Sequence, residues 1–267
     1  MRELEREQDN NERREAGVPP LAVIGSGRMG RAIHGAARSE GIDSRLAGRE
    51  DALKACEGAE AALLCVPDAR IEEACEAIAE AVPALRFVGH TSGALGAEPL
   101  HAATARGAAA FGLHPLQTIT RDDPELIGAS CAVSGSTPEA LELARALAHR
   151  LGMRSFELPE AKRAAYHAAA SIASNFLVTL EESAVRLLQA AGVDEGRARL
   201  GPLVLRTATN WSEDGPEALT GPIARGDEAT VERHLEAIEA ECPELLDLYR
   251  ALAERTRALA GDSEVRA

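Results

Sequence analysis

The sequence predicts an α/β N-terminal domain with a mostly parallel sheet, followed by an all-α C-terminal domain. Short apolar runs alternate with longer amphipathic segments from Leu21 to Leu158, a glycine-rich turn follows the first run, and strand patterns are absent after Pro159. Strands that alternate with helices are joined by right-handed crossovers, which make neighbouring strands parallel. We therefore expect an N-terminal domain over 18–158 and a helical domain over 159–267.

Strands are expected where short apolar runs lie between turn residues. The run Ala61-Ala-Leu-Leu-Cys-Val66 is apolar throughout, which is typical of a parallel strand covered on both faces. The expected strands are 21–24, 44–47, 61–66, 86–90, 108–113, 129–134 and 154–158, and the expected helices between them are 31–40, 69–81 and 138–151.

The C-terminal half carries only helical patterns. A stretch without Pro or Gly runs over 160–191 and ends at Gly192. Further helices are expected over 195–211, with a break at Gly201-Pro202, over 227–241 with Asp227 as its N-cap, and over 244–260.

Composition excludes several classes of partner. The 267 residues carry 29 Lys+Arg and 43 Asp+Glu, a formal net charge of −14. Such an acidic surface repels phosphate backbones, so we expect no nucleic-acid partner. No window approaches the roughly 18 apolar residues of a membrane span. Five cysteines lack metal-ligand spacing, so we expect reduced thiols and no metal site.

The N-terminal segment 1–17 is charged throughout and has no apolar stretch of the kind that signal peptides contain. We expect a solvated, disordered tail and a cytoplasmic location.

The glycine-rich turn fits the pattern G-x-G-x-x-G. Its residues are Gly25, Ser26, Gly27, Arg28, Met29 and Gly30, and they lie between an expected strand and an expected helix. In a Rossmann-type domain, the first glycine allows the tight turn, the second lets a pyrophosphate approach the backbone, and the third lets helix and strand pack closely. The turn therefore predicts a dinucleotide site; a tight turn without a ligand is the alternative.

The residue after the second strand indicates which dinucleotide binds. NAD sites usually place a carboxylate there, whereas Arg49 stands nineteen residues after Gly30 in this chain. A guanidinium suits the 2′-phosphate of NADP through charge-assisted bonds. Arg28 can assist, whereas a shift of one residue would place Glu50 at the ribose instead. We expect NADP in preference to NAD.

Several stretches together resemble a known family. They are the glycine turn, Val66-Pro-Asp68, His90-Thr-Ser-Gly-Ala94, Leu113-His-Pro-Leu-Gln117, Tyr166-His-Ala-Ala-Ala-Ser-Ile-Ala-Ser-Asn175 and Ala218-Leu-Thr-Gly-Pro-Ile-Ala-Arg-Gly-Asp227. The sequence resembles bacterial Rossmann-like proteins with a C-terminal domain of unknown function, number 2520. That family is similar to deazaflavin-dependent NADP oxidoreductases, with a helical domain like that of 6-phosphogluconate dehydrogenase. Pyrroline-5-carboxylate reductase and ketopantoate reductase are more distant relatives.

The resemblance implies a path for the nicotinamide past the third and fourth strands. Val66, Pro67 and Thr91 would line it, and Ser92 would contact the substrate. These residues follow strand carboxyl ends, where open parallel sheets bind ligands.

Candidate catalytic residues recur along the long helix. His167, Ser171, Ser174 and Asn175 have the spacing of one α-helical face. The related hydroxyacid dehydrogenases carry a lysine and an asparagine four residues apart on such a helix, and here Ser171 takes the lysine position and Asn175 the asparagine position. We expect His167 to replace the lysine as proton donor, Asn175 to orient the reacting atom and Ser171 to contact substrate. A polar face without catalytic function is the alternative.

Two further residues complete the expected site. His114 follows an expected strand and is a second candidate for the proton donor. Arg225 lies in the loop before the helix at Asp227 and is expected to bind a substrate carboxylate. In related helical domains such loops also close dimer interfaces, so we expect a homodimer formed through the helical domain.

The sequence thus predicts an NADP(H)-dependent oxidoreductase that acts on a small anionic carbonyl or imine compound. The alternative is an NADP-binding regulator without turnover, which the missing helix lysine favours.

Overall fold

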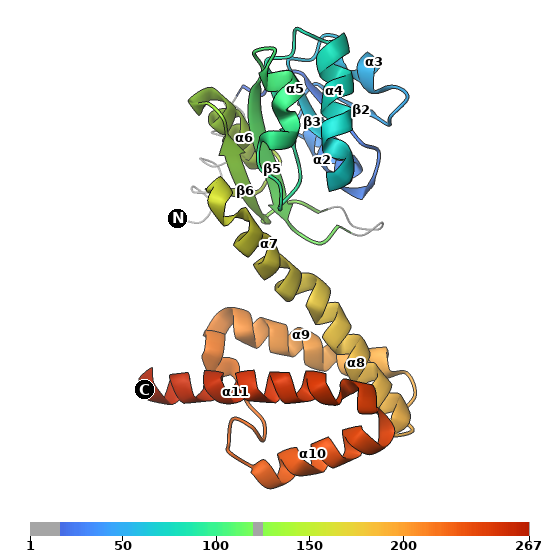
Figure 1. The fold of residues 1–267 in the computed structure, drawn as a ribbon, viewed down its shortest axis with the longest axis vertical. Helices are drawn as coiled ribbons and strands as arrows, with labels where there is room; N and C mark the ends of the chain where they lie inside the picture. The colour runs from blue at the N-terminus through green and yellow to red at the C-terminus, as the bar shows by residue number, and fades with distance from the viewer. Residues whose placement is uncertain (1–16, 120–124, 267) are drawn as a thin grey trace. The chain divides into compact units, whose positions relative to one another are not determined.

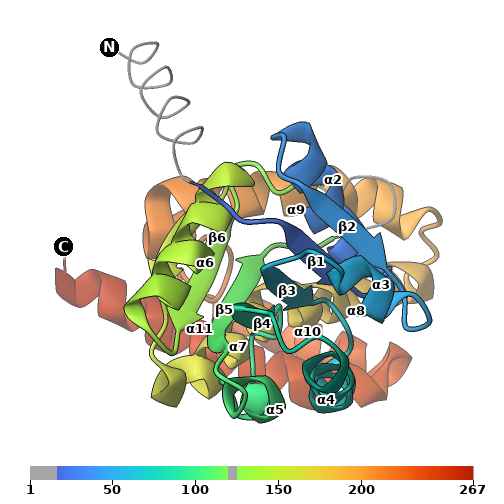
Figure 2. The same ribbon diagram turned by 90° about the horizontal axis from the view of Figure 1, so that it is seen from above.

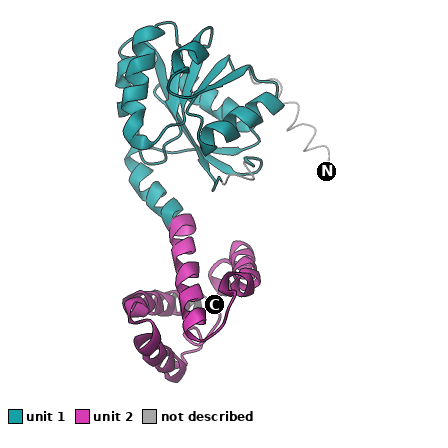
Figure 3. Cartoon of the chain, turned by 90° about the vertical axis from the view of Figure 1, so that its right-hand side faces the viewer, with its two compact units in different colours: residues 1–171 teal, residues 172–267 magenta. Residues whose placement is uncertain are grey.

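The structure, a computed structural model, describes residues 17–119 and 125–266. The chain divides into two compact units, Met1–Ser171 and Ile172–Ala267 (Figure 3). The expected tail lies outside the described residues except for Gly17. The division falls inside the long helix rather than before it, because the first turns of this helix belong with the sheet.

The first unit contains a seven-stranded sheet in the order β2-β1-β3-β4-β5-β6-β7 (Figure 1). Its strands are β1 Leu21–Ile24, β2 Ser44–Ala47, β3 Ala61–Leu64, β4 Phe87–His90, β5 Ala109–Leu116, β6 Ser130–Gly135 and β7 Arg154–Glu157. The first five strands are parallel, β6 is antiparallel to β5, and β7 is parallel to β6. The predicted α/β class with a mostly parallel sheet is confirmed.

Helices cover both faces of this sheet (Figure 2). On one face, α2 (Arg28–Ser39) and α6 (Pro138–Arg150) pack with Val23 and Leu63; on the other, α3 (Ala52–Cys56), α4 (Ile71–Ala81) and α5 (His101–Thr104) pack with Ala22 and Leu64. Successive strand residues point to opposite faces, so each short apolar strand contributes to both cores. Burying one large aliphatic side chain contributes about 1.5–3 kcal/mol.

The structure differs from the expected elements in a few places. β5 continues three residues beyond Leu113, because its antiparallel partner pairs with it as far as Leu116. The residue His114 therefore lies within a strand rather than after one. Helices α3 and α5 were not expected, since five and four residues are too few to show helical periodicity.

The long helix begins with a 3₁₀ turn, Glu160–Lys162, and continues as α7 (Arg163–Ser171). A π-helical turn, Ile172–Phe176, separates α7 from α8 (Leu177–Ala190). The expected stretch 160–191 is thus helical but not uniformly α-helical. The π-turn widens the spiral between Ser171 and Asn175, so α-helical spacing does not carry across it; such turns are frequent at functional sites.

The described part of the second unit contains α8 and three further helices. These are α9 Gly196–Asp214, α10 Glu228–Glu241 and α11 Leu246–Arg266, with 3₁₀ turns at Gly215–Ala218 and Pro243–Leu245. The Asp227 carboxylate caps α10 by accepting from the Thr230 amide at 3.1 Å and its hydroxyl at 2.7 Å. The expected break at Gly201-Pro202 is absent, because α9 continues through Pro202.

Apolar burial is sparse in this unit. Its buried apolar side chains include Val185, Val231, Ile238, Leu245 and Ala253, whereas several large apolar side chains of the π-turn, α8 and α9 are more than half exposed: Ile172, Phe176, Val178, Leu203, Leu205 and Trp211. Among the described residues, no helix has the length and apolarity needed to cross a bilayer.

Candidate active site

The glycine turn connects β1 to α2 and is shaped by two close backbone approaches. Gly25 has φ 121°, and a Cβ atom there would lie 2.3 Å from the carbonyl oxygen of Cys65. A Cβ atom on Gly30 would lie 1.8 Å from the carbonyl oxygen of Gly25. Both positions therefore require glycine so that β1, β3 and α2 can meet.

Gly27 differs from the other two glycines because a Cβ atom there would meet no described atom within 4 Å. It is the N-cap of α2 and provides no side-chain cap to the first amides of the helix. The N-terminus of α2 is thus open to an anion, with amide groups and the helix dipole available to bind it. These features fit the pyrophosphate of a dinucleotide.

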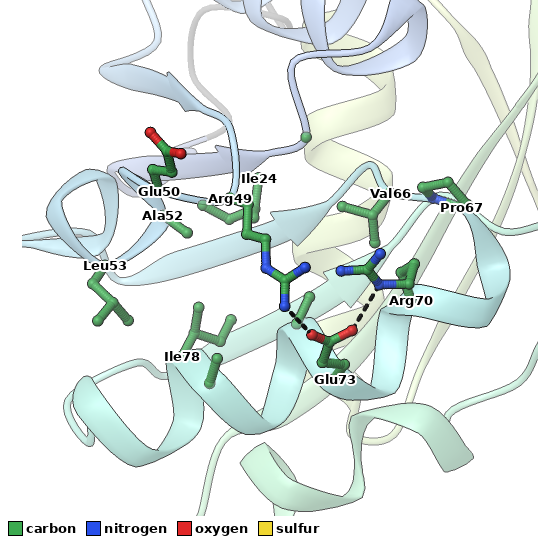
Figure 4. A pocket seen from close by; sticks show the side chains of 13 residues that line it. Ile24, Arg49, Glu50, Ala52, Leu53, Val66, Pro67, Arg70, Glu73 and Ile78 are labelled. Atoms are coloured by element: carbon green, nitrogen blue, oxygen red, sulfur yellow. Dashed lines mark hydrogen bonds and ion pairs between the residues drawn. The ribbon is translucent and has the colours of Figure 1, made fainter.

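A cavity of about 480 Å³ lies beside this turn, where the chain reverses the strand order between β1 and β3 (Figure 4). Open α/β sheets bind ligands at such a switch point. The predicted cofactor residues Gly25, Arg49, Val66 and Pro67 line it. Its other lining residues are mostly apolar and include Ala52, Leu53, Ala74, Ala77 and Ile78.

Charged side chains gather at one part of this cavity. The guanidinium of Arg49, from the segment after β2, pairs with the carboxylate of Glu73 on α4. Arg70, at the end of the 3₁₀ turn Asp68–Arg70, donates from Nε to the other oxygen of Glu73 at 2.7 Å. The spacing of Arg49 after Gly30 predicted its role, whereas Arg70 and Glu73 were not predicted, because the i,i+3 spacing between them was their only signal in the sequence.

Glu50 also lines the cavity but is oriented differently. In Figure 4, its carboxylate points away from the group formed by Arg49, Glu73 and Arg70. The ribose contact considered for Glu50 in the sequence therefore has less support than the contact proposed for Arg49.

A second polar cluster lies at the carboxyl ends of β3 and β4. The Ser92 hydroxyl donates to the Asp68 carboxylate at 2.8 Å and accepts from the amides of Ala94 and Leu95. The ring of His90 is buried and bonds the Gly96 carbonyl oxygen through Nε2 at 2.6 Å. These bonds fix the loop after β4, so that Ser92 and Gly93 hold defined positions.

His114 on β5 lies beside this loop and bonds Tyr166 on α7. Nδ1 of His114 is 2.6 Å from the Tyr166 hydroxyl, and the rings meet edge to face at 5.5 Å. The ring centroid of His167 is 6.4 Å from that of His114. A Cβ atom on Gly93 would lie 2.8 Å from the His114 ring and 3.0 Å from the His167 ring. The structure thus brings both candidate histidines together above Gly93.

The environment keeps His114 neutral at pH 7. Burial, followed by the charges of His167 and Arg163, lowers the pKa of His114 to about 4. Burial also raises the pKa of Tyr166 to about 12, so the phenol keeps its proton. A phenol is a stronger donor than a neutral imidazole N–H, so we assign the hydrogen bond from Tyr166 to Nδ1. His114 then carries its proton on Nε2, available as a hydrogen-bond donor.

Beneath this cluster lies Arg163, which is only 4% exposed. Its guanidinium donates to the Ser134 hydroxyl at 2.6 Å and to the Ser92 carbonyl at 3.5 Å, and its Nε meets no acceptor among the described residues. Gly112 makes room for it, since a Cβ atom there would lie 2.7 Å from Nη2. The burial of Arg163 was not predicted, because an arginine in a polar helical turn is typical of an exposed position.

The remaining predicted residues lie in several elements. Thr91 follows β4, and its amide donates to the Leu64 carbonyl at 3.1 Å. Ser171 ends α7 in the first unit, whereas Asn175, in the π-turn, and Arg225, in the turn before α10, are exposed residues of the second unit. Within residues 17–119 and 125–266, no three His, Cys, Asp or Glu side chains are grouped as metal ligands would be.

Comparison with family models places these features in a known context. Residues 28–115 match the Rossmann-like domain, and residues 129–256 match the domain of unknown function DUF2520. The chain joins a Rossmann-like domain to a DUF2520 domain. The DUF2520 match begins at β6, so this family unit includes the last strands of the sheet as well as the helices. No protein with a curated description matches the chain.

Solved structures show the same fold. A proposed NADP oxidoreductase from Bacteroides fragilis has a TM-score of 0.74 at 20% identity, covering 90% of this chain and 98% of its own. A protein from Thermotoga maritima has a TM-score of 0.72 at 24% identity, with 91% and 99% covered. An imine reductase from Myxococcus stipitatus in complex with NADP⁺ has a TM-score of 0.60 at 16% identity, with 93% and 95% covered.

Proposed function

We propose that this protein is an NADP(H)-dependent oxidoreductase that transfers a hydride to or from a small anionic carbonyl or imine compound. The observation that carries the proposal is that several features of a dehydrogenase site occur at one edge of the sheet. There, the open glycine turn and its Arg49-lined cavity accompany a partly buried His114, which is kept neutral by its environment and bonded to Tyr166 through Nδ1. The named activities of the Bacteroides and Myxococcus neighbours support it.

The residues of the glycine turn fit the cofactor. The open face at Gly27 and the uncapped start of α2 suit a pyrophosphate, with Ser26, Arg28, Met29 and Gly30 completing the turn. Arg49 would bind the 2′-phosphate, and Val66, Pro67 and Thr91 would line the path toward the nicotinamide. When bound, the reduced cofactor supplies the hydride.

The chain's own residues would orient and polarise the substrate. His114 would donate from Nε2 to the carbonyl oxygen or imine nitrogen, and Tyr166 would hold the imidazole in that tautomer. A neutral imidazole polarises the acceptor without delivering a full positive charge. His167, beside it, would supply the proton that the product needs, and Ser92 would contact the substrate.

Ser171, at the end of α7, and two residues of the helical unit would contribute the remaining groups. We assign substrate contacts to Ser171, orientation of the reacting atom to Asn175 and the substrate carboxylate to Arg225. The exposed apolar side chains of the π-turn, α8 and α9 support a homodimer, because few apolar side chains of this unit are buried within one chain. Light scattering at micromolar concentration tests this: a monomer would contradict the dimer.

The function is tested by NADPH oxidation with a panel of small keto acids and cyclic imines. We expect turnover with at least one substrate and a loss of about 100-fold in kcat/KM for His114→Ala, with NADPH affinity retained. Tight NADPH binding without turnover on any substrate would overturn the enzyme proposal and favour an NADP-binding regulator.

A further inference from the structure

Arg49, Glu73 and Arg70 form a charged group that contains two guanidiniums, although one arginine is enough to bind a phosphate. Two guanidiniums from different segments of the chain converge on the two oxygens of one carboxylate (Figure 4). We propose that Arg70 is a second ligand of the 2′-phosphate of NADP, and that Glu73 holds both guanidiniums in place and reduces the preference for NADP over NAD. This proposal rests on the proposed function, because it names further residues for the same cofactor.

The backbone positions of Arg49, Arg70 and Glu73 bring their three side chains together. Arg49 follows β2, whereas Arg70 ends the 3₁₀ turn after β3 and its amide donates to the Pro67 carbonyl at 2.7 Å. Glu73 lies one turn further along, on the first turn of α4. The side chains are 74%, 46% and 51% exposed for Arg49, Arg70 and Glu73. A ligand arriving from solvent can therefore reach all three charged groups.

The cavity beside these charges fits the rest of an adenosine. Ala52, Leu53, Ala74, Ala77 and Ile78 supply an apolar surface for a flat ring. The charged groups lie at the same cavity as Gly25, which belongs to the expected pyrophosphate turn. The ligand chemistry that this arrangement recognises is thus an adenosine with an additional anion on its ribose.

Charge balance gives Glu73 its role. Two guanidiniums and one carboxylate leave a local charge of +1, whereas a phosphomonoester carries about −1.5 to −2 near pH 7. Glu73 relieves the repulsion between the arginines before the phosphate arrives, but it repels the phosphate once bound. Neutralising Glu73 therefore favours a ligand with the 2′-phosphate and changes little for a ligand with a 2′-hydroxyl.

The experiment measures binding without any reaction. Calorimetric titration uses 2′,5′-ADP and 5′-AMP as probes, with NADPH and NADH followed by nicotinamide fluorescence. We expect Arg70→Gln to weaken 2′,5′-ADP and NADPH about tenfold while 5′-AMP and NADH change less than about twofold. We expect Glu73→Gln to tighten 2′,5′-ADP and NADPH about threefold to fivefold, since the sites are exposed and screened.

The control variant is Glu80→Gln, which removes the same charge from the same helix at a residue outside the cavity lining. It should leave every affinity within about twofold of wild type. An Arg70→Gln protein with unchanged 2′,5′-ADP affinity would overturn the assignment of Arg70. A Glu73→Gln protein that binds 2′,5′-ADP no tighter than the control would overturn the role of Glu73.

Failure of the proposed function would look different. A wild type that binds 5′-AMP and NADH better than their phosphorylated counterparts would overturn the NADP assignment together with this inference. A wild type with the expected variant pattern but no turnover on any substrate would leave the inference standing and overturn hydride transfer alone.

Discussion

Two tyrosine–histidine pairs occur in the described chain, one in each unit, with nearly the same local geometry. Tyr166 and His114 are joined at 2.6 Å with rings 5.5 Å apart at 88°, and Tyr249 and His234 at 2.8 Å with rings 5.9 Å apart at 89°. The first pair lies against the buried guanidinium of Arg163 and a second histidine, whereas the second pair lies on exposed helix surfaces. The comparison teaches that burial and neighbouring charge, rather than pair geometry, make a candidate site.

Acid sensitivity should separate the two pairs most strongly. The pKa of His114 is about 4 in the folded protein and about 6.5 in an exposed chain, so protons favour the unfolded state as pH falls below 6.5. His114 should therefore remove up to about 3 kcal/mol from the free energy of unfolding between pH 6.5 and 4, with none removed above that range. Urea unfolding at several pH values measures this for wild type and His114→Asn.

The matched control is His234→Asn. Its free energy of unfolding should fall as the pH is lowered from 6.5 to 4, as that of the wild type does. If His114→Asn also followed the wild-type curve, the assignment of a neutral, partly buried imidazole to His114 would be contradicted.

Crowding the two histidines should give the next largest effect. Gly93→Ala places a Cβ atom 2.8 Å from the His114 ring, which must move. A displacement of this kind is expected to cost about 100-fold in kcat/KM, with a loss of about 1–3 kcal/mol in stability. Gly35→Ala, on α2 with no described atom within 4 Å of its Cβ position, is the control and should retain wild-type kinetics. Equal kinetics for both variants would contradict the proposed roles of His114 and His167 in the reaction.

Removing one phenol hydroxyl tests the pairs directly. Tyr166→Phe frees the His114 tautomer and should lower kcat/KM about tenfold, mainly through kcat, because a hydrogen bond of about 1–1.5 kcal/mol is lost. Tyr249→Phe removes the equivalent bond in the helical unit and should leave kcat unchanged. A change in the pH profile for Tyr166→Phe alone would mark the role as positioning rather than structural. Identical kinetics in the two variants would break the comparison.

The smallest effect is expected at the exposed charges beside the cavity. Arg49→Gln should change the free energy of unfolding by less than about 1 kcal/mol, because its pair with Glu73 is solvated and screened. Thermal unfolding at low and high salt measures this. A loss of several kcal/mol would show that the pair stabilises the fold rather than serving a ligand.

Much of the fold was predictable because its strands are short runs of apolar residues between turns. The seven strands of the sheet and the helical second half follow from this local pattern. The extra length of β5 was not predictable, since it depends on an antiparallel partner strand. The π-turn was not predictable either, because its small and apolar residues do not differ from those of an ordinary helix.

The candidate site likewise contains some residues that the sequence predicts and others that only the folded structure brings together. The glycine turn and Arg49 are found through spacing along the chain, and the structure places both beside one cavity. Glu73 lies 24 residues from Arg49, and Tyr166 lies 52 residues from His114, so these pairs exist only in the folded chain. Burial of Arg163 is likewise a tertiary property, which no local pattern indicates.

The position of the π-turn has a consequence for where the chain can be divided in a chimaera. Recombination at the end of the sheet, after Leu158, would separate Arg163, Tyr166 and His167 from the strands that they contact. Recombination within Ile172–Phe176 would keep those contacts intact and replace only the helices beyond. A chimaera joined within the π-turn should therefore keep the contacts of His114, Tyr166 and His167 while its helical half is exchanged.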